Sequence, residues 1–319
     1  MCLIAFAINA SQRWPLVIAA NRDEFLDRPT APLSHWKTPS GQDIFSGRDL
    51  RAGGTWLGFS PGGRVAFLTN VREAPAPGLA AVAAPLSRGE LVTRWLEASV
   101  DAAAFAAALE SERASYGGFN LVLGDAQRNA WTWITNKSGD RSANTSHPLG
   151  SAGNHASAWH VQSLAPGVYG LSNAALNTPW PKTLALQTAL AAALTASARE
   201  PDAKTLQAQL WTALANRERA PRDKLPATGV PLALEEALSS AFVAYPEHGY
   251  GTRSSTVLLL SSAEPGPGEA DPDGSGENGA GHWQLHVEEQ THWPDVPRPV
   301  SVALAVTMAV NLPAPPPST

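Results

Sequence analysis

Hydrophobic residues occupy every position of the first extended segment, residues 2–8. One alternating set is Cys2, Ile4, Phe6 and Ile8, and the other is Leu3, Ala5 and Ala7. Because neighbouring side chains of a strand point to opposite faces, this pattern predicts a strand that other elements cover on both sides. Residues 15–25 predict a second strand, and a hairpin with the first would bring its polar end back toward Cys2.

Further strands are predicted where short apolar runs flank turn residues. They cover 55–60 and 64–70 around Pro61, Gly62 and Gly63, then 117–125 and 129–136, and finally 253–262 and 282–290. The regions between them predict helices. A Ser-x-x-Glu capping pair, Ser87 and Glu90, opens the first helix, and residues 101–116 predict the second. Thr178 and Pro179 predict the start of a long helix up to 198, and helices at 203–217 and 231–242 follow.

Strands covered on both faces, a similar helix content and few strand–helix–strand alternations predict an α+β fold. The expected architecture is a four-layer helix–sheet–sheet–helix (αββα) sandwich of two antiparallel sheets, formed by residues 1–311 as one domain. Residues 263–281 are rich in Gly, Pro and acidic residues, so we expect a mobile hairpin loop there. Residues 312–319 are expected to be a disordered tail.

Charge and composition exclude several kinds of partner. The 319 residues include 23 Lys plus Arg against 28 Asp plus Glu, and this net charge of −5 offers no basic field for nucleic acid. The longest late apolar run, 300–310, is far shorter than the roughly 20 residues that span a bilayer. One cysteine forms no internal disulfide and no secretory signal is evident, so a cytoplasmic protein with a small-molecule partner is expected.

Cys2 is the only cysteine and directly follows Met1. If Met1 is removed, a thiol and a free α-amine share one residue, and the amine, with a reference pKa of about 7.7 to 8.0, can accept the thiol proton. Nearby cations would then lower the pKa of the thiol. The alternative is that Cys2 is a small buried hydrophobe at the edge of the core.

The polar string at 21–25 ends the second predicted strand. A hairpin would place Arg22 and Asp23 where they could hold a thiolate or an ammonium through charge-assisted hydrogen bonds. The alternative is an ordinary solvated turn. Adjacent strand residues face opposite ways, so only a bulge or a turn would direct both side chains at Cys2.

Several ordered segments resemble the NRDE family, also called the Transport and Golgi organisation 2 family. They are MCLIAFA (1–7), AANRDEF (19–25), GGTWLGFS (53–60), LTNVR (68–72), SRGELV (87–92), GFNLVLGD (118–125), YGLSNAALNTPWPK (169–182) and YGTRSSTVLL (250–259). The resemblance runs from Cys2 to about His292. It implies an Ntn-hydrolase-like fold, in which Ntn stands for N-terminal nucleophile, but no agreed reaction; animal members are linked to haem mobilisation and lipid metabolism.

A more distant resemblance is to cysteine-type Ntn hydrolases such as bile-salt hydrolases and penicillin acylases. It implies Cys2 as nucleophile, Arg22 and Asp23 as the pair after the second strand, Asn173 as an oxyanion-binding residue and Arg253 as a later arginine, and Asn70 is a further candidate oxyanion donor. Those enzymes separate the arginine from the aspartate by two residues, whereas here the two are adjacent. This departure bears most on the assignment of Asp23.

Two functions fit these features. The first is hydrolysis of a non-peptide amide or related acyl bond by Cys2, with no required cofactor or metal. The second is a non-catalytic carrier or chaperone that binds haem or an acylated metabolite in the same pocket. Candidate haem or metal ligands are His155, His160, His282 and His286, which could equally be surface residues, and an apolar pocket could be lined by Trp56, Trp131, Trp133 and Trp180.

Overall fold

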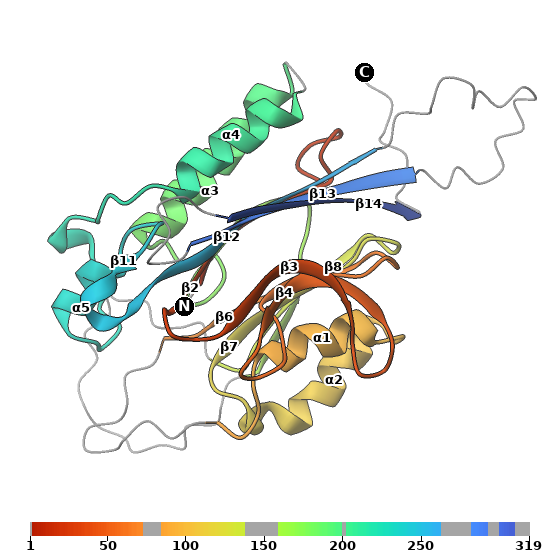
Figure 1. Cartoon of the computed structure of the whole chain (residues 1–319), viewed down its shortest axis with the longest axis horizontal. Helices are drawn as coiled ribbons and strands as arrows, with labels where there is room; N and C mark the ends of the chain where they lie inside the picture. Colours follow the sequence, from red (N-terminus) through yellow and green to blue (C-terminus); the bar gives the residue numbers. More distant parts are fainter. Residues whose placement is uncertain are drawn as a thin grey trace, which may run out of the picture.

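Two antiparallel sheets form the middle of the molecule, and a pair of helices covers the outer face of each sheet (Figure 1). The four-layer αββα order expected from the sequence is confirmed. This computed structural model describes residues 2–72, 84–137, 159–199, 202–262, 282–292 and 300–309. The expected loop at 263–281 and tail at 312–319 lie outside the described residues.

The first sheet contains the N-terminal hairpin. Its strands run in the order β10 (Gly167–Leu171), β1 (Cys2–Ile8), β2 (Leu16–Phe25), β12 (Tyr250–Ser262), β13 (His282–Thr291) and β14 (Val300–Ala309), and β11 (Ala244–Tyr245) pairs with β12. β1 and β2 pair as expected, with Cys2 directly opposite Arg22. The polar end of β2 therefore lies beside the start of β1.

The second sheet is built largely from consecutive strands. Their order is β3 (Thr30–Lys37), β4 (Asp43–Asp49), β5 (Leu57–Phe59), β6 (Arg64–Asn70), β7 (Phe119–Asp125), β8 (Ala130–Thr135) and β9 (His160–Ser163). The β5–β6 and β7–β8 hairpins are those that the turn residues predict. β3, β4 and β9 have no counterpart among the strands expected from the sequence.

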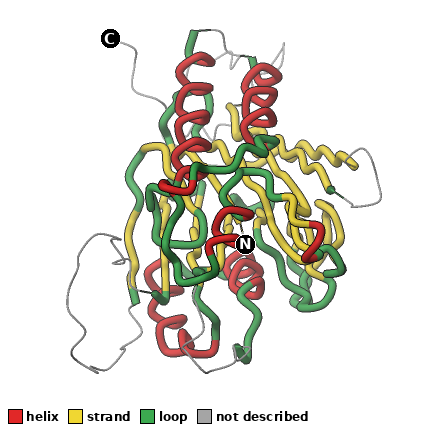
Figure 2. Tube along the Cα trace, turned by 90° about the vertical axis from the view of Figure 1, so that its left-hand side faces the viewer, coloured by secondary structure: helices red, strands yellow, loops and turns green. Residues whose placement is uncertain are grey.

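The helices cover the sheets in pairs, which Figure 2 shows at opposite ends of the molecule. α1 (Gly89–Glu97) and α2 (Ala102–Glu112) pack on the second sheet, and α3 (Pro181–Ser197) and α4 (Ala203–Leu214) pack on the first. The shorter helices are α5 (Leu232–Ala237) and three 3₁₀ turns, Arg113–Ser115, Arg222–Lys224 and Pro246–His248. No helix in the described part of the chain has both the length and the apolar composition of a membrane span.

Two predicted helix starts are wrong in detail. α1 follows Arg88, and the amide of Glu90 donates to the backbone carbonyl of Ser87, so no side-chain capping box forms. α3 begins at Pro181, later than expected, because the hydroxyl of Thr178 donates instead to the carbonyl of Ala175 at 2.8 Å. In both cases no side chain caps the start of the helix.

β1 is buried on both faces, as its sequence predicts. Ile4 and Phe6 belong to the core between the two sheets, whereas Leu3 and Ala5 pack beneath α3 and α4. Cys2 shares the face of Ile4 and Phe6, so its thiol is directed between the sheets.

Candidate active site

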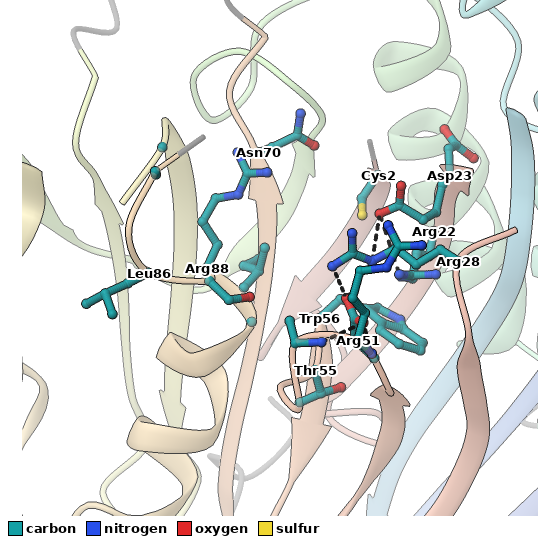
Figure 3. Close-up of a pocket in the computed structure, with 18 of the residues that line it drawn as sticks. Cys2, Arg22, Asp23, Arg28, Arg51, Thr55, Trp56, Asn70, Leu86 and Arg88 are labelled. Carbon is teal, nitrogen blue, oxygen red and sulfur yellow. Dashed lines mark hydrogen bonds and ion pairs between the residues drawn. The ribbon is translucent and has the colours of Figure 1, made fainter. Parts of the chain in front are cut away.

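Cys2 borders a cavity of about 630 Å³ that both sheets and the start of α1 line. The residue is 8% exposed. Figure 3 shows its sulfur facing the cavity, with Arg22 and Trp56 on one side and Asn70 and Arg88 on another. The single cysteine is therefore a buried residue whose thiol can still be reached by a small molecule.

Arg22 accompanies the thiol because the two residues are paired across β1 and β2 and share one face. Its guanidinium carbon lies 4.4 Å from the centroid of the Trp56 ring, a cation–π contact. The same group lies 3.6 Å from the carboxylate of Glu24. A cation is thus held on the thiol side of the sheet by an aromatic ring and a carboxylate.

Asp23 faces the opposite side of β2, toward the helices. Figure 3 shows its carboxylate directed away from the sulfur of Cys2. The side chain is fully buried, and the hydroxyl of Thr252 donates to its Oδ1 at 2.7 Å. Burial raises the pKa of Asp23, and the positive charges of Lys182 and of the amino end of the chain oppose this rise. The alternation of strand residues thus separates Arg22 from Asp23, and β2 has no bulge between them.

Asn70 ends β6 and borders the cavity. Asn173 is almost fully buried, and its side-chain amide donates to both the backbone oxygen (2.9 Å) and the side-chain oxygen (3.1 Å) of Asn70. Asn173 is absent from the described cavity wall. Of the two predicted oxyanion donors, Asn70 faces the cavity and Asn173 holds it in place.

Arg253 lies at a register shift of β12, between Thr252 and Ser254, and is 1% exposed. Its Nη1 donates to the backbone oxygens of Phe25, Leu26 and Arg28, at 3.0, 2.7 and 3.2 Å. These bonds fix the turn after β2. Arg253 is absent from the described cavity wall, and its guanidinium binds the backbone behind it.

Most other polar residues of the cavity carry charge, and the sequence reasoning missed them. They are Glu24, Arg28, Asp49, Arg51 and Arg88. Arg28 makes a two-pronged contact with Oδ2 of Asp49, at 2.8 Å from Nε and 2.7 Å from Nη2. No spacing rule in the sequence connects these residues, because they come from three separate segments, 24–28, 49–51 and 88, that only the fold brings together.

The four tryptophans that could line an apolar pocket lie at different places in the described part of the structure. Trp56 borders the cavity, but Trp131 and Trp133 pack in the core between the sheets. Trp180 lies under the guanidinium of Arg72 at 5.1 Å. Of the four tryptophans, Trp56 alone belongs to the described cavity wall, and charged residues accompany it there.

Buried charges also lie behind Asp23, on the helix side of the sheet. Arg72 and Glu235 form an ion pair of 2.6 Å that is almost inaccessible to solvent. Lys182, on the first turn of α3, is 5% exposed, and its Nζ has no hydrogen-bond partner among the described residues. Burial lowers the pKa of Lys182 to about 8, although Asp23 opposes the change.

The thiol of Cys2 differs from the expectation of an acidic nucleophile. Burial raises the pKa of Cys2, and this outweighs the opposing effects of the amino end of the chain and of Arg22. Asp23 and Glu24 raise it further. At neutral pH the group is a thiol, so nucleophilic attack requires a base that removes its proton.

Histidines contribute nothing to the described wall of the cavity. His160 lies on β9 against the ring of Trp133, and His286 lies on β13 near Gln284. His155 and the side chain of His282 lie outside the described part of the chain. Within that part, no cluster of three or more His, Cys, Asp or Glu side chains could hold a metal ion.

These observations define a class: a four-layer αββα protein with an N-terminal cysteine at a charged cavity between its sheets. Residues 1–265 match the Transport and Golgi organisation 2 family, and the chain belongs to this family. A bovine (Bos taurus) Transport and Golgi organization protein 2 homolog is 34% identical over 270 residues, which cover 82% of this chain and 89% of that protein. The human (Homo sapiens) homolog is 32% identical over 271 residues, with the same coverage.

Among solved structures, penicillin V acylase from Agrobacterium tumefaciens is similar to this chain with a TM-score of 0.41. The two are 13% identical, and the match covers 91% of each chain. The layer order of the present protein rests on its own sheets and helices, described above.

Proposed function

We propose that the chain is a cytosolic N-terminal-cysteine hydrolase of a non-peptide amide or a related acyl bond, matured by removal of Met1. One observation carries the proposal. The only thiol of the chain borders a cavity at the start of β1, with Arg22 on its own side of the sheet and the carboxylate of Asp23 directed to the other. This arrangement separates a group that acts on the thiol from a group that acts on the amine.

In the proposed reaction the sulfur of Cys2 attacks the carbonyl carbon of the substrate. The α-amine of Cys2 takes the thiol proton and passes it to the leaving amine, so that the carbon–nitrogen bond breaks and a thioester forms. Water then attacks the thioester, gives a proton back through the amine and releases the acid with a free thiol. The amine is the required base because burial raises the pKa of Cys2.

Asn70 and Asp23 would have separate roles in this reaction. The side-chain amide of Asn70 would donate to the oxyanion, and one such donor is worth about 3 kcal/mol in other enzymes. Asn173 would keep that amide oriented through its two hydrogen bonds to Asn70. Asp23 would hold the α-amine of Cys2 after removal of Met1, and the positive amino end of the unprocessed chain already opposes the rise in the pKa of Asp23.

The charges of the cavity bear on what it binds. Arg28, Arg51 and Arg88 come from three different segments of the wall, together with Asp49. A lining of this kind favours a substrate with polar or charged groups near its acyl bond over a flat apolar one. The carrier hypothesis rests on the same cavity, where the Cys2 sulfur would be one ligand to haem iron and contact with the rest of the wall would supply most of the affinity.

The test combines intact mass, a substrate screen and haem titration. Loss of Met1 is expected, and turnover of an acyl amide or thioester should disappear in Cys2→Ala while substrate binding stays near normal. The acyl-enzyme of the unmodified protein should appear as a mass increment on Cys2. Arg22→Met should also slow turnover, whereas Arg13→Met, an exposed arginine near the far end of the same hairpin that lies 5.5 Å from the Trp14 ring, should not.

Two results would contradict the hydrolase. Quantitative retention of Met1 would remove the base, because an acylated nitrogen cannot accept the proton. Tight, saturable haem binding that survives in Cys2→Ala, with no Cys2-dependent turnover of any substrate, would favour the carrier instead.

A further inference from the structure

Trp56 rests on a glycine of the neighbouring strand. A Cβ atom added to Gly47 of β4 would lie 2.4 Å from Cη2 and 2.7 Å from Cζ2 of the Trp56 ring. Real Cβ atoms do not approach other atoms so closely, so any residue larger than glycine at 47 would displace the ring. The ring is 8% exposed and is otherwise packed in the core between the sheets.

The same ring carries Arg22. The guanidinium carbon lies 4.4 Å from the ring centroid, although Arg22 belongs to the first sheet and Trp56 immediately precedes β5 of the second. The polar contacts of this guanidinium are long, 3.5 Å to the Thr30 hydroxyl and 3.6 Å to the carboxylate of Glu24. The face of the Trp56 ring therefore fixes the direction of the guanidinium together with these two long polar contacts.

We propose that Gly47 and Trp56 are positioning residues of the Cys2 site: the glycine seats the indole ring, and the ring holds Arg22 beside the thiol. The inference rests on the proposed function in treating Cys2 as the reactive group. The physical link is electrostatic, because Arg22 lowers the pKa of Cys2 while Glu24 raises it. If the guanidinium moves away from the thiol, burial and the carboxylates raise the pKa of Cys2 without this opposing charge.

The second sheet offers a matched control. A Cβ added to Gly124 of β7 would lie 2.3 to 2.7 Å from three atoms of the Trp131 ring, and Trp131 is 5% exposed. Gly124 and Trp131 face each other across β7 and β8, and neither borders the described cavity. Gly47→Ala and Gly124→Ala thus insert the same methyl group under the same kind of ring, one next to Cys2 and one away from it.

The experiment measures the rate of Cys2 alkylation by iodoacetamide between pH 6 and 10, together with the melting temperature of each variant. Gly47→Ala should raise the apparent pKa of the thiol by about half to one unit, which slows alkylation at pH 7 by about three- to tenfold. Gly124→Ala should lose a similar amount of thermal stability but change the rate by less than about twofold. Trp56→Leu should match Gly47→Ala, and Trp56→Phe, which keeps an aromatic face, should recover part of the loss.

An Arg22→Met background tests the proposed route. Adding Gly47→Ala or Trp56→Leu to Arg22→Met should have no further effect on the alkylation profile, because the group that they position is gone. Equal effects of the two glycine variants, or a full Trp56→Leu effect in the Arg22→Met background, would overturn the proposal. If Gly47→Ala does not fold, the Trp56 variants decide alone. Alkylation needs no substrate, so absence of turnover would contradict the proposed function and leave this inference standing.

Discussion

Lys182→Met should change how the stability of the protein depends on alkaline pH. Lys182 is buried at the start of α3, and its Nζ makes no hydrogen bond within the described residues. Burial lowers its pKa from 10.5 to about 8. This difference corresponds to about 3 kcal/mol of unfolding free energy, since each pKa unit is worth about 1.4 kcal/mol.

The sign follows from proton counting. Between pH 8 and 10.5 the unfolded lysine keeps a proton that the folded lysine has released, so the unfolded state binds more protons and the native protein gains stability as pH rises. Below pH 8 both states are charged and the full penalty of burying the ammonium remains. Methionine has no proton, so the unmodified protein should gain about 3 kcal/mol relative to Lys182→Met across this window.

Urea unfolding of both proteins at half-unit steps from pH 7 to 10.5 measures the effect. A change in packing that binds or releases no proton adds only a constant offset to the free energy of unfolding, so the slope of the difference against pH is the quantity that matters. The control variant Lys204→Met, at an exposed position of α4, should differ from the unmodified protein by an amount that does not change with pH. A difference between native and Lys182→Met that does not change with pH would refute the reasoning, because Lys182 would then titrate alike in both states.

Two further predictions concern other buried charges. Glu289 is 2% exposed and accepts a hydrogen bond from the Leu33 amide at 2.7 Å. Burial raises the pKa of Glu289 from 4.5 to about 7. Between these pH values the folded state holds a proton that the unfolded state has released, so the stability of the protein falls as pH rises. Glu289→Gln should remove this decline, which amounts to about 3 kcal/mol in the free energy of unfolding measured with urea. The prediction is contradicted if the variant shows the same decline. Glu235→Gln should lower the free energy of unfolding by about 3 kcal/mol, because it breaks the buried ion pair with Arg72. The double variant Glu235→Gln and Arg72→Met should recover part of this loss, whereas additive losses would show that the two residues are not coupled.

Local patterns predicted the elements whose two faces are buried or whose turns are marked. The continuous apolar run of β1 and the turn residues between β5 and β6 are of this kind. Strands with mixed patterns were not predicted. β3 contains Pro32 and several polar residues, and β9 is exposed along its length. Their pairing partners stabilise them, and a pairing partner is not visible in a short window of sequence.

The sequence by itself predicted the layer order and the hairpin of β1 and β2 that returns residues 21–25 toward Cys2, because the alternation of side chains and the turn residues are visible along the chain. The pairing register in the structure decided that Arg22, and not Asp23, shares the face of Cys2. Only the tertiary structure decided the surroundings of these groups. Asp23 faces the helix layer near Lys182, Asn173 holds Asn70, and Arg253 binds backbone oxygens. The thiol is less acidic than expected because burial, which depends on packing between distant segments, outweighs the nearby cations that the sequence displays.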